Sequence, residues 1–223
     1  METPVWKSVM VTRHLPEELS GLETLCKNLW WCWNDSAKAL FKTVDADLWH
    51  KSGHNPMEIL DKVSLKRYKE LAKDGEFLSR LAAVMKEFES YMDAKSKRTE
   101  PSVGYFCMEY GLDTSLKIYS GGLGILAGDY LKETSDMNVN LVAVGLLYRY
   151  GYFTQRLTPQ GNQVAEYDAQ DFLKIPAEPV FDKDGNWLSI SIQLPGRLMS
   201  ARIWKVAVGR TDLYLLDTDF EAN

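Results

Sequence analysis

The chain has 223 residues, of which 45% are hydrophobic, 26% are charged and 12% are aromatic. This length fits one large domain or two small ones of roughly 100–200 residues, and the composition excludes collagen, coiled coil and extensive disorder. The formal net charge is −5. Residues 1–100 carry 16 basic and 16 acidic side chains, so the whole net negative charge lies in residues 101–223. A nucleic-acid-binding protein needs a basic surface, so that class of function is excluded.

The sequence also lacks signals for export and for membrane insertion. No apolar run approaches the roughly 20 residues that span a bilayer, and the first residues, METPVWK, lack the charged-then-apolar pattern of a signal peptide. The three cysteines, Cys26, Cys32 and Cys107, are odd in number and have apolar neighbours. We interpret them as buried thiols rather than a disulfide framework and expect a cytoplasmic protein.

Residues 15–92 are predicted to be helical. Apolar side chains recur at helical spacing from Leu19 to Trp30, after Pro16 at a first-turn position. A longer helix is predicted from about Glu76 to Met92, followed by a polar linker or helix end over residues 93–101. Helix N-caps are predicted at Asp35 or Ser36, at Asn55, and at Ser64.

The pattern changes after residue 100. Residues 103–108 and 141–148 are short, continuous apolar runs, which are typical of strands covered on both faces. A glycine-rich loop and a helix ending near Asp136 lie between them, so we predict a βαβ unit with parallel strands and a right-handed crossover. Residues 180–218 are predicted to be antiparallel, with turns at 182–185 and 209–212. The fold class is therefore α/β, with a helical segment over residues 1–100 and a strand-rich part over residues 101–223.

The glycine-rich loop is the first candidate site. Gly121, Gly122 and Gly124 precede a helix, where unpaired backbone N–H groups and the helix dipole can bind an anion. A P-loop is disfavoured because its lysine and serine or threonine are missing. The spacing from Gly122 to Gly128 loosely matches a dinucleotide fingerprint, and Arg149 after the next strand would suit only a 2′-phosphate. A plain glycine turn that packs helix on strand remains the alternative.

Other polar and aromatic groups have two interpretations each. Glu109 directly follows the first strand, so it either lines the ligand cleft or holds the glycine loop in place. Trp30, Trp31 and Trp33 could stack on sugar rings, but core packing is favoured because tryptophan is usually buried. A metal site at His50 and His54 is disfavoured by the neighbouring Gly53 and Pro56, so no metal is expected.

Several of these segments together resemble the amino-terminal domain of α-glucan phosphorylases. The matching blocks are residues 105–111 (YFCMEYG), 118–129 (IYSGGLGILAGD), 144–153 (VGLLYRYGYF), 204–210 and 213–219. The helical part resembles the extra amino-terminal segment of the shorter bacterial phosphorylases at residues 28–34, 48–49 and 54–56. The resemblance thus covers nearly the whole chain.

The resemblance implies phosphorolysis of α-1,4-glucan by inorganic phosphate, which releases glucose 1-phosphate. It implies pyridoxal 5′-phosphate as cofactor and two Rossmann-like lobes of the GT-B type with the site between them. By this resemblance Gly121 lies by the cofactor phosphate, the Gly122 N–H binds the substrate phosphate and Leu123 touches the sugar. Gly122 and Glu109 are the candidates for the catalytic site.

Members of this family are several times longer, and their cofactor lysine lies in the second lobe. We therefore expect this chain alone to be a fragment without turnover, which exposes apolar surface and can form homo-oligomers. Two alternatives from other classes remain: a stand-alone glucan- or phosphosugar-binding or scaffolding module, and an NADP-binding oxidoreductase half.

Overall fold

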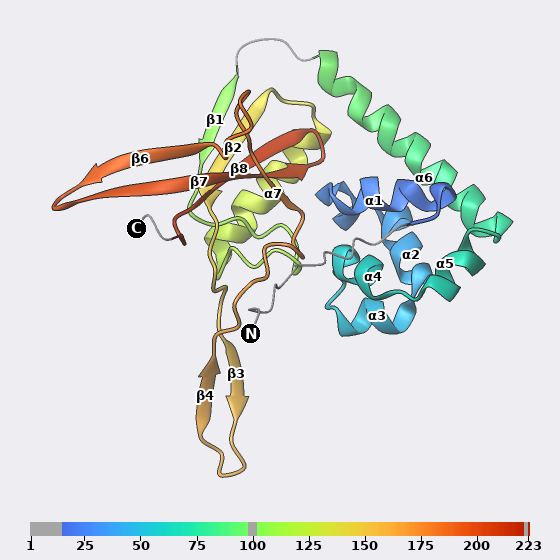
Figure 1. The fold of residues 1–223 in the computed structure, drawn as a ribbon, viewed down its shortest axis with the longest axis horizontal. Helices are drawn as coiled ribbons and strands as arrows, with labels where there is room; N and C mark the ends of the chain where they lie inside the picture. The colour runs from blue at the N-terminus through green and yellow to red at the C-terminus, as the bar shows by residue number, and fades with distance from the viewer. Residues whose placement is uncertain (1–14, 98–101, 221–222) are drawn as a thin grey trace, which may run out of the picture.

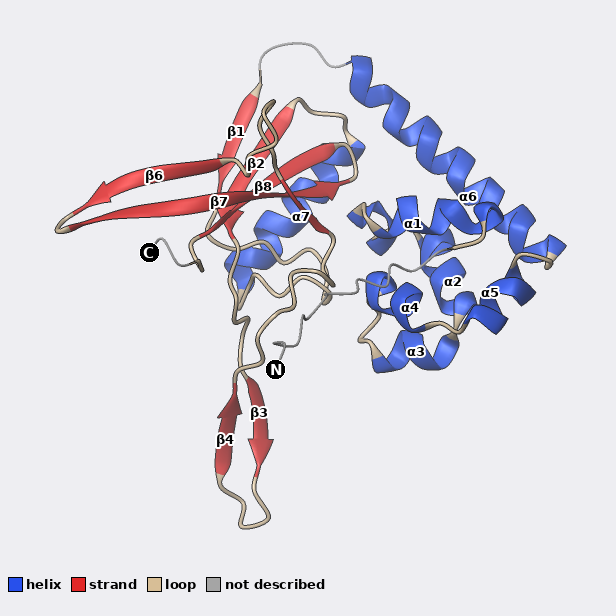
Figure 2. Ribbon diagram, in the orientation of Figure 1, coloured by secondary structure: helices blue, strands red, loops and turns tan. Residues whose placement is uncertain are grey.

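The structure is a computed structural model that describes residues 15–97, 102–220 and 223. It is a mixed α/β fold in which helices come first and a sheet follows (Figures 1 and 2). The helical part lies beside the sheet. Its elements are η1 (Glu17–Leu19), α1 (Ser20–Cys26), η2 (Leu29–Cys32), α2 (Asp35–Val44), α3 (Ala46–Lys51), α4 (Pro56–Lys62), α5 (Leu65–Leu71), α6 (Gly75–Asp93) and η3 (Ala94–Lys97).

Side-chain caps define where most of these helices begin. Asn55 and Ser64 accept hydrogen bonds from the first-turn N–H groups of α4 and α5, which confirms both predictions. The predicted cap at Asp35 or Ser36 was wrong, because Asn34 caps α2 one residue earlier through the N–H of Ala37. The predicted linker is a 3-10 turn over its described residues 94–97, and residues 98–101 lie outside the described residues.

The first predicted helix is interrupted. Apolar spacing had suggested one helix through Leu19 and Trp30, but α1 ends at Cys26 and Asn28 is extended, with φ −118° and ψ 118°. The chain then continues as η2. The apolar spacing persists across the break because both pieces bury their side chains in the same core.

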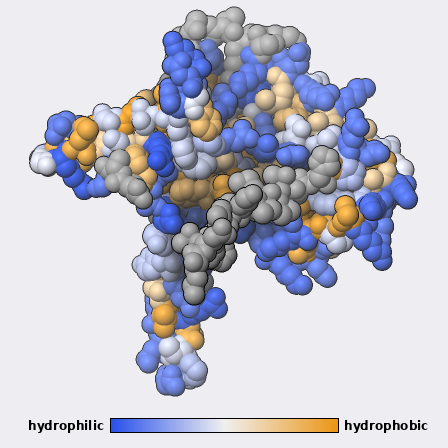
Figure 3. All heavy atoms as spheres, in the orientation of Figure 1, coloured by the Kyte–Doolittle hydropathy of each residue, from blue (hydrophilic) through white to orange (hydrophobic). Residues whose placement is uncertain are grey.

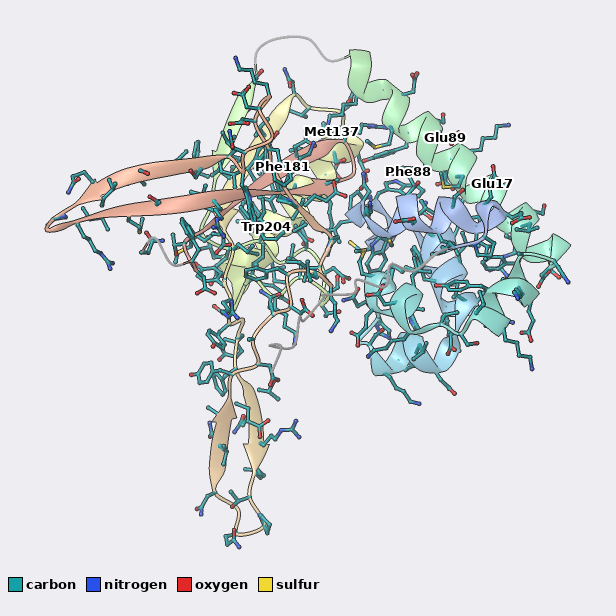
Figure 4. All side chains as sticks on the ribbon, in the orientation of Figure 1. Glu17, Phe88, Glu89, Met137, Phe181 and Trp204 are labelled. Atoms are coloured by element: carbon teal, nitrogen blue, oxygen red, sulfur yellow. The ribbon has the colours of Figure 1, made fainter. Side chains whose placement is uncertain are left out.

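The tryptophans and cysteines of this part belong to the core. Trp30 and Trp31 are buried, and the ring of Trp30 lies 5.3 Å from that of Phe88, which reaches it from α6 (Figure 4). This confirms core packing over a sugar-stacking platform for these two residues. Cys26 is buried, the other two cysteines are half-buried, and none of the three forms a disulfide.

The sheet confirms the predicted βαβ unit. Strand β1 pairs with β2 in parallel, and the connection between them contains α7. The sheet order is β1-β2-β8-β7-β5, with β6 also paired to β7, and β8 runs parallel to β2, a pairing that was not predicted. The elements are β1 (Val103–Phe106), α7 (Gly122–Asp136), β2 (Leu141–Leu146), β3 (Thr154–Leu157), β4 (Gln163–Glu166), β5 (Ala177–Pro179), β6 (Ser189–Leu194), β7 (Arg197–Val208) and β8 (Thr211–Asp217).

The prediction that β1 and β2 are covered on both faces was wrong. Leu141, Ala143 and Gly145 are buried on one face of β2, whereas Val142 and Leu146 are exposed on the other. On β1 the ring of Phe106 is 76% exposed. The apolar residues of these two strands follow one another without polar interruption, and this pattern predicts two buried faces. Only one face is covered within this chain.

The turns of the antiparallel part are where the sequence placed them. Gly185 has a φ of 81° in the turn after Asp182, and Gly209 has a φ of 57° between β7 and β8. Two hairpins, β3–β4 and β6–β7, project from the body of the molecule (Figure 1). Figure 3 shows apolar side chains among hydrophilic ones on both of them. In the described part of the chain, no helix is long and apolar enough to cross a bilayer.

Candidate functional site

The glycine loop leads into α7 as predicted. Gly121 is the N-cap residue, with an extended backbone at φ −159° and ψ −165°, and it provides no side-chain cap. Helices α2 to α6, in contrast, are each capped by a side chain. The N–H groups of Gly124 and Ile125 donate to the carbonyl of Gly121. The N–H groups of Gly122 and Leu123 therefore form the open end of the helix, where the dipole favours a negative charge.

The glycines of this loop divide into two groups. A Cβ built on Gly121 or Gly122 would meet no atom within 4 Å, so space is open on that side of the loop. A Cβ on Gly124 would lie 2.5 Å from Cβ of Tyr119, and one on Gly128 would lie 2.3 Å from the carbonyl oxygen of Gly111. The later two glycines thus serve packing, which accounts for the loose dinucleotide spacing, while the first two border open space.

Glu109 lies between the end of β1 and the glycine loop. Its Oε1 accepts a hydrogen bond of 2.7 Å from the hydroxyl of Ser120, the residue before the glycines. The same side chain is half-buried and lines a pocket. Both interpretations of Glu109 therefore have a structural counterpart: it holds the loop through Ser120, and it presents a carboxylate to the cleft.

This pocket has a volume of about 450 Å³ and is rich in aromatic rings. The hydroxyl of Tyr148 donates to the carbonyl of Met108 at 3.1 Å. Burial, and next the negative charge of Glu109, raise the pKa of the Tyr148 phenol. The lining residues are Glu109, Lys117, Ile118, Tyr119, Ser120, Tyr148, Tyr150, Gly151, Tyr152, Phe153 and Tyr167.

The side chain of Arg149 has a different environment from those of its neighbours Tyr148 and Tyr150. Tyr148 and Tyr150 line the pocket, whereas the guanidinium of Arg149 forms an ion pair of 2.6 Å with Asp219. The NADP interpretation relied on Arg149 for a 2′-phosphate, and in this structure its guanidinium is paired with the Asp219 carboxylate.

Leu123 lies in the first turn of α7 and is 53% exposed. The buried side of this helix is formed instead by Gly124, Ala127, Gly128 and Leu131. The residue that the resemblance places against the sugar is therefore accessible next to the open helix end.

His50 and His54, the two histidines in the described part of the chain, are not arranged as a metal site. The ring of His54 stacks on that of Trp49 at 4.8 Å and lies 5.7 Å from that of His50. A backbone of positive φ at Gly53 and His54 ends the helical spacing between the two histidines. Among the described residues, no group of three or more histidine, cysteine or acidic side chains is suited to hold a metal ion.

Sequence reasoning missed the aromatic pocket as a site. The sequence left open whether residues 148–150 line the cleft or pair with acidic neighbours, and Tyr167 and Gln170 were not singled out. Their signal is the density of aromatic side chains directly after a strand, but Tyr119 and Tyr167 come from other segments and join the pocket only in the folded chain.

Comparisons with known proteins agree with the resemblance. A family model described as "Protein of unknown function (DUF3417)" matches residues 15–116. The chain is 41% identical to a maltodextrin phosphorylase of Thermococcus litoralis over 94% of this chain and 26% of that protein. It is 38% identical to a glycogen phosphorylase of Mycobacterium tuberculosis, over 96% of this chain and 26% of that protein. A glycogen phosphorylase of Aquifex aeolicus is 41% identical over 91% of this chain and 30% of its own length.

The chain thus spans about a quarter of the length of the curated relatives that it matches. The blocks that carry the resemblance include the open end of α7, Glu109 and part of the aromatic pocket. Over nearly all of its length, the chain is a homologue of the amino-terminal quarter of maltodextrin and glycogen phosphorylases.

Proposed function

We propose that this chain is the amino-terminal part of an α-glucan phosphorylase, an enzyme that cleaves α-1,4-glucan with inorganic phosphate and releases glucose 1-phosphate. The observation that carries the proposal is the uncapped N-terminus of α7, with open space at Gly121 and Gly122 and the carboxylate of Glu109 beside it. The homology to phosphorylases supports it.

In this proposal the open helix end binds phosphate groups. The N–H of Gly122 donates to the substrate phosphate, Gly121 lies by the cofactor phosphate and Leu123 contacts the sugar. Donors held by a helix need no rearrangement as charge shifts during the reaction, which is the main advantage of such a site. Glu109 positions the loop through Ser120 and faces the sugar side of the cleft.

The donor set of this chain fits only the phosphate end of pyridoxal 5′-phosphate. Two backbone N–H groups at a helix end suit a phosphate. When bound, the cofactor supplies through its phosphate an acid/base group next to the substrate phosphate. Its lysine, by the resemblance, belongs to the part of a phosphorylase that this chain does not include.

The open face of the sheet supports a larger protein. Parallel strands are almost always covered on both faces, whereas Phe106, Val142 and Leu146 are exposed here. We infer that residues 101–223 are part of a GT-B-type lobe, that residues 1–100 form a helical segment beside it, and that the remainder of a phosphorylase covers this face. Without that cover, the same face favours self-association.

The test compares two polypeptides. The 223-residue chain, incubated with maltodextrin, phosphate and pyridoxal phosphate, is expected to release no glucose 1-phosphate and to bind no cofactor covalently. The polypeptide that includes the whole reading frame is expected to release glucose 1-phosphate. Turnover by the 223-residue chain overturns the proposal that it is an incomplete enzyme, and inactivity of the complete polypeptide overturns the phosphorylase assignment.

A stand-alone glucan-binding module is the second candidate, and the aromatic pocket favours it. It predicts binding of maltodextrin by a polypeptide that has no phosphorolytic activity even when complete. The same pair of assays therefore separates the two candidates.

A further inference from the structure

We propose that the outer edge of strand β6 pairs in antiparallel orientation with β6 of a second copy of this chain, across a two-fold axis. Strand β6 (Ser189–Leu194) belongs to the β6–β7 hairpin, which projects from the body of the molecule (Figure 1). Among the described strands it is paired with β7 alone. The inference goes beyond the proposed function and does not rest on it.

The backbone groups that point outward from β6 follow from the contacts of Ser200 on β7. The N–H of Ser200 donates to Oδ1 of Asn223 at 2.8 Å, and its carbonyl accepts from Nδ2 of the same side chain at 2.8 Å. Both groups therefore point away from β6. Ser191 lies opposite Ser200, and hydrogen-bonded and non-hydrogen-bonded pairs alternate along an antiparallel ladder. The N–H and carbonyl groups of Ser189, Ser191 and Gln193 are consequently directed to the outer edge.

Strand β6 has none of the features that usually prevent a sheet edge from pairing. Such edges carry charged side chains, proline or a bulge. Strand β6 has the sequence SISIQL, and its register with β7 is continuous over the whole strand. The edge strand β5, in contrast, contains Glu178 and Pro179, and the hairpin β3–β4 carries Arg156 and Glu166. The outer edge of β6 is therefore suited to accept another strand.

The sequence of β6 is complementary to itself in one antiparallel register. A two-fold axis at Ser191 places this residue opposite Ser191 of the second copy, and it places Ser189 opposite Gln193 of the second copy. These are the residues whose backbone groups point outward, so each such pair exchanges two hydrogen bonds. The two-fold symmetry makes the contact isologous, which is the arrangement that closes as a dimer.

The same register brings apolar side chains together. Ile190 faces Ile192 of the second copy, and Leu188 faces Leu194 of the second copy. Opposite residues of this kind have Cβ atoms about 4.5–5.5 Å apart, which permits side-chain contact. Leu188, Ile190 and Ile192 are 40%, 39% and 46% exposed, so the pairing removes apolar surface from water. Residues 188–195 (LSISIQLP) carry no charge, so no like charges meet.

A later segment of a longer polypeptide is the other candidate partner for this edge. The two-fold arrangement is favoured because β6 and Leu188 themselves supply every hydrogen bond and apolar contact that it needs. A different strand would have to match the same order of apolar and polar side chains.

The test follows the mass of the polypeptide that includes the whole reading frame, by analytical ultracentrifugation over a range of concentrations. Ser191→Lys places two like charges opposite each other at the axis and is expected to raise the dissociation constant of this contact about five-fold. Ser191→Glu is expected to do the same. An equimolar mixture of the two variants is expected to recover the association, since opposite charges then meet across the axis.

Two control variants are expected to associate as the unaltered polypeptide does. The hydroxyl groups of Ser191 and Ser200 lie 2.9 Å apart, so Ser191→Ala tests the loss of this contact without adding charge. Gln155→Lys adds the same charge to an exposed strand position of the other hairpin, β3–β4. Association through other surfaces is common to all variants and cancels in the comparison.

Hydrogen exchange of the amides of Ser189, Ser191 and Gln193 is the second measurement, and their protection is expected to rise with protein concentration. Protection at every concentration, with a mass that Ser191→Lys does not change, means that the same polypeptide covers the edge, and it overturns the proposal. Unprotected amides at the highest concentration also overturn it. If the mixture of charged variants associates no better than either alone, the register at Ser191 is wrong. Phosphorolysis by the same polypeptides decides the proposed function independently of these outcomes.

Discussion

The side-chain amide of Asn28 pairs with the backbone of Gly209, 181 residues later in the chain. Its Oδ1 accepts from the N–H of Gly209 at 2.8 Å, and its Nδ2 donates to the carbonyl of Gly209 at 3.0 Å. The same Oδ1 accepts from the N–H of Trp30 at 2.9 Å. Asn28 lies between α1 and η2, and Gly209 forms the turn between β7 and β8. One buried amide therefore joins the helical part to the sheet.

Replacing Asn28 by alanine is expected to lower the free energy of unfolding by about 2–4 kcal/mol. The reason is that three hydrogen bonds are lost and the backbone of Gly209 is left buried without those partners. Urea unfolding followed by circular dichroism measures this change. Asn34→Ala is the control, because it removes a helix cap and an exposed hydrogen bond to Glu87 without touching the sheet, and it is expected to cost about 1 kcal/mol. Equal losses in the two variants would show that the pairing with Gly209 contributes nothing of its own.

Gly128→Ala is expected to destabilise the chain by about 1–3 kcal/mol, although alanine favours helices. The new Cβ would lie 2.3 Å from the carbonyl oxygen of Gly111, and a backbone atom cannot swing aside as a side chain can. Gly75→Ala at the start of α6 is the control, since a Cβ there meets nothing within 4 Å, and it is expected to be neutral or slightly stabilising. Thermal midpoints of both variants give the comparison, and a stable Gly128→Ala would mean that α7 shifts freely on the loop.

Gly122→Ala is expected to leave stability nearly unchanged and to lower phosphorolysis by the complete enzyme about 10²–10³-fold. A Cβ at this position has no atom within 4 Å, and Gly122 is not among the glycines of positive φ. Alanine there therefore introduces neither a steric clash nor backbone strain. The Cβ instead occupies the space at the open helix end, where the phosphate is proposed to bind. The two readouts are the phosphorolysis rate and the thermal midpoint. Normal turnover with a large fall in the midpoint would mean that the loop serves packing alone.

Cys32 is expected to resist alkylation at pH 8. Burial raises the pKa of its thiol to about 12, so the reactive thiolate is scarce at that pH. Iodoacetamide labelling followed by mass spectrometry should show slow modification of Cys32 in the folded chain and rapid modification in urea. Because the folded pKa exceeds the unfolded one, the folded state holds the proton more tightly, and stability should fall as pH rises above the unfolded thiol's pKa. Labelling of Cys32 at equal rates in both states would contradict its burial.

Part of the fold is local and could be predicted from the sequence. The caps at Asn55 and Ser64, the turns at Gly185 and Gly209 and the parallel βαβ unit all depend on residues close together in the chain. Local signals failed where neighbouring segments share one core. The apolar spacing from Leu19 to Trp30 predicted a single helix, yet the chain breaks at Asn28, which is extended to reach Gly209.

The candidate site also has features that the local sequence predicts and features that depend on tertiary contacts. An anion site at Gly121 and Gly122 follows from glycines before a helix, which is a local pattern. Which glycines border open space and which pack against Tyr119 and Gly111 was not readable from the sequence, because those neighbours belong to a preceding loop.

The sequence by itself determined the helix caps at Asn55 and Ser64, the order of strands and helix around the glycine loop, and the resemblance to phosphorylases, since each rests on residue types at short spacing. The tertiary structure alone decided that one face of β1 and β2 is uncovered, that Arg149 pairs with Asp219, and that aromatic rings from three segments meet beside Glu109. These features depend on contacts between segments far apart in the chain, and a periodic pattern of apolar residues specifies which side chains are buried but not which neighbour buries them.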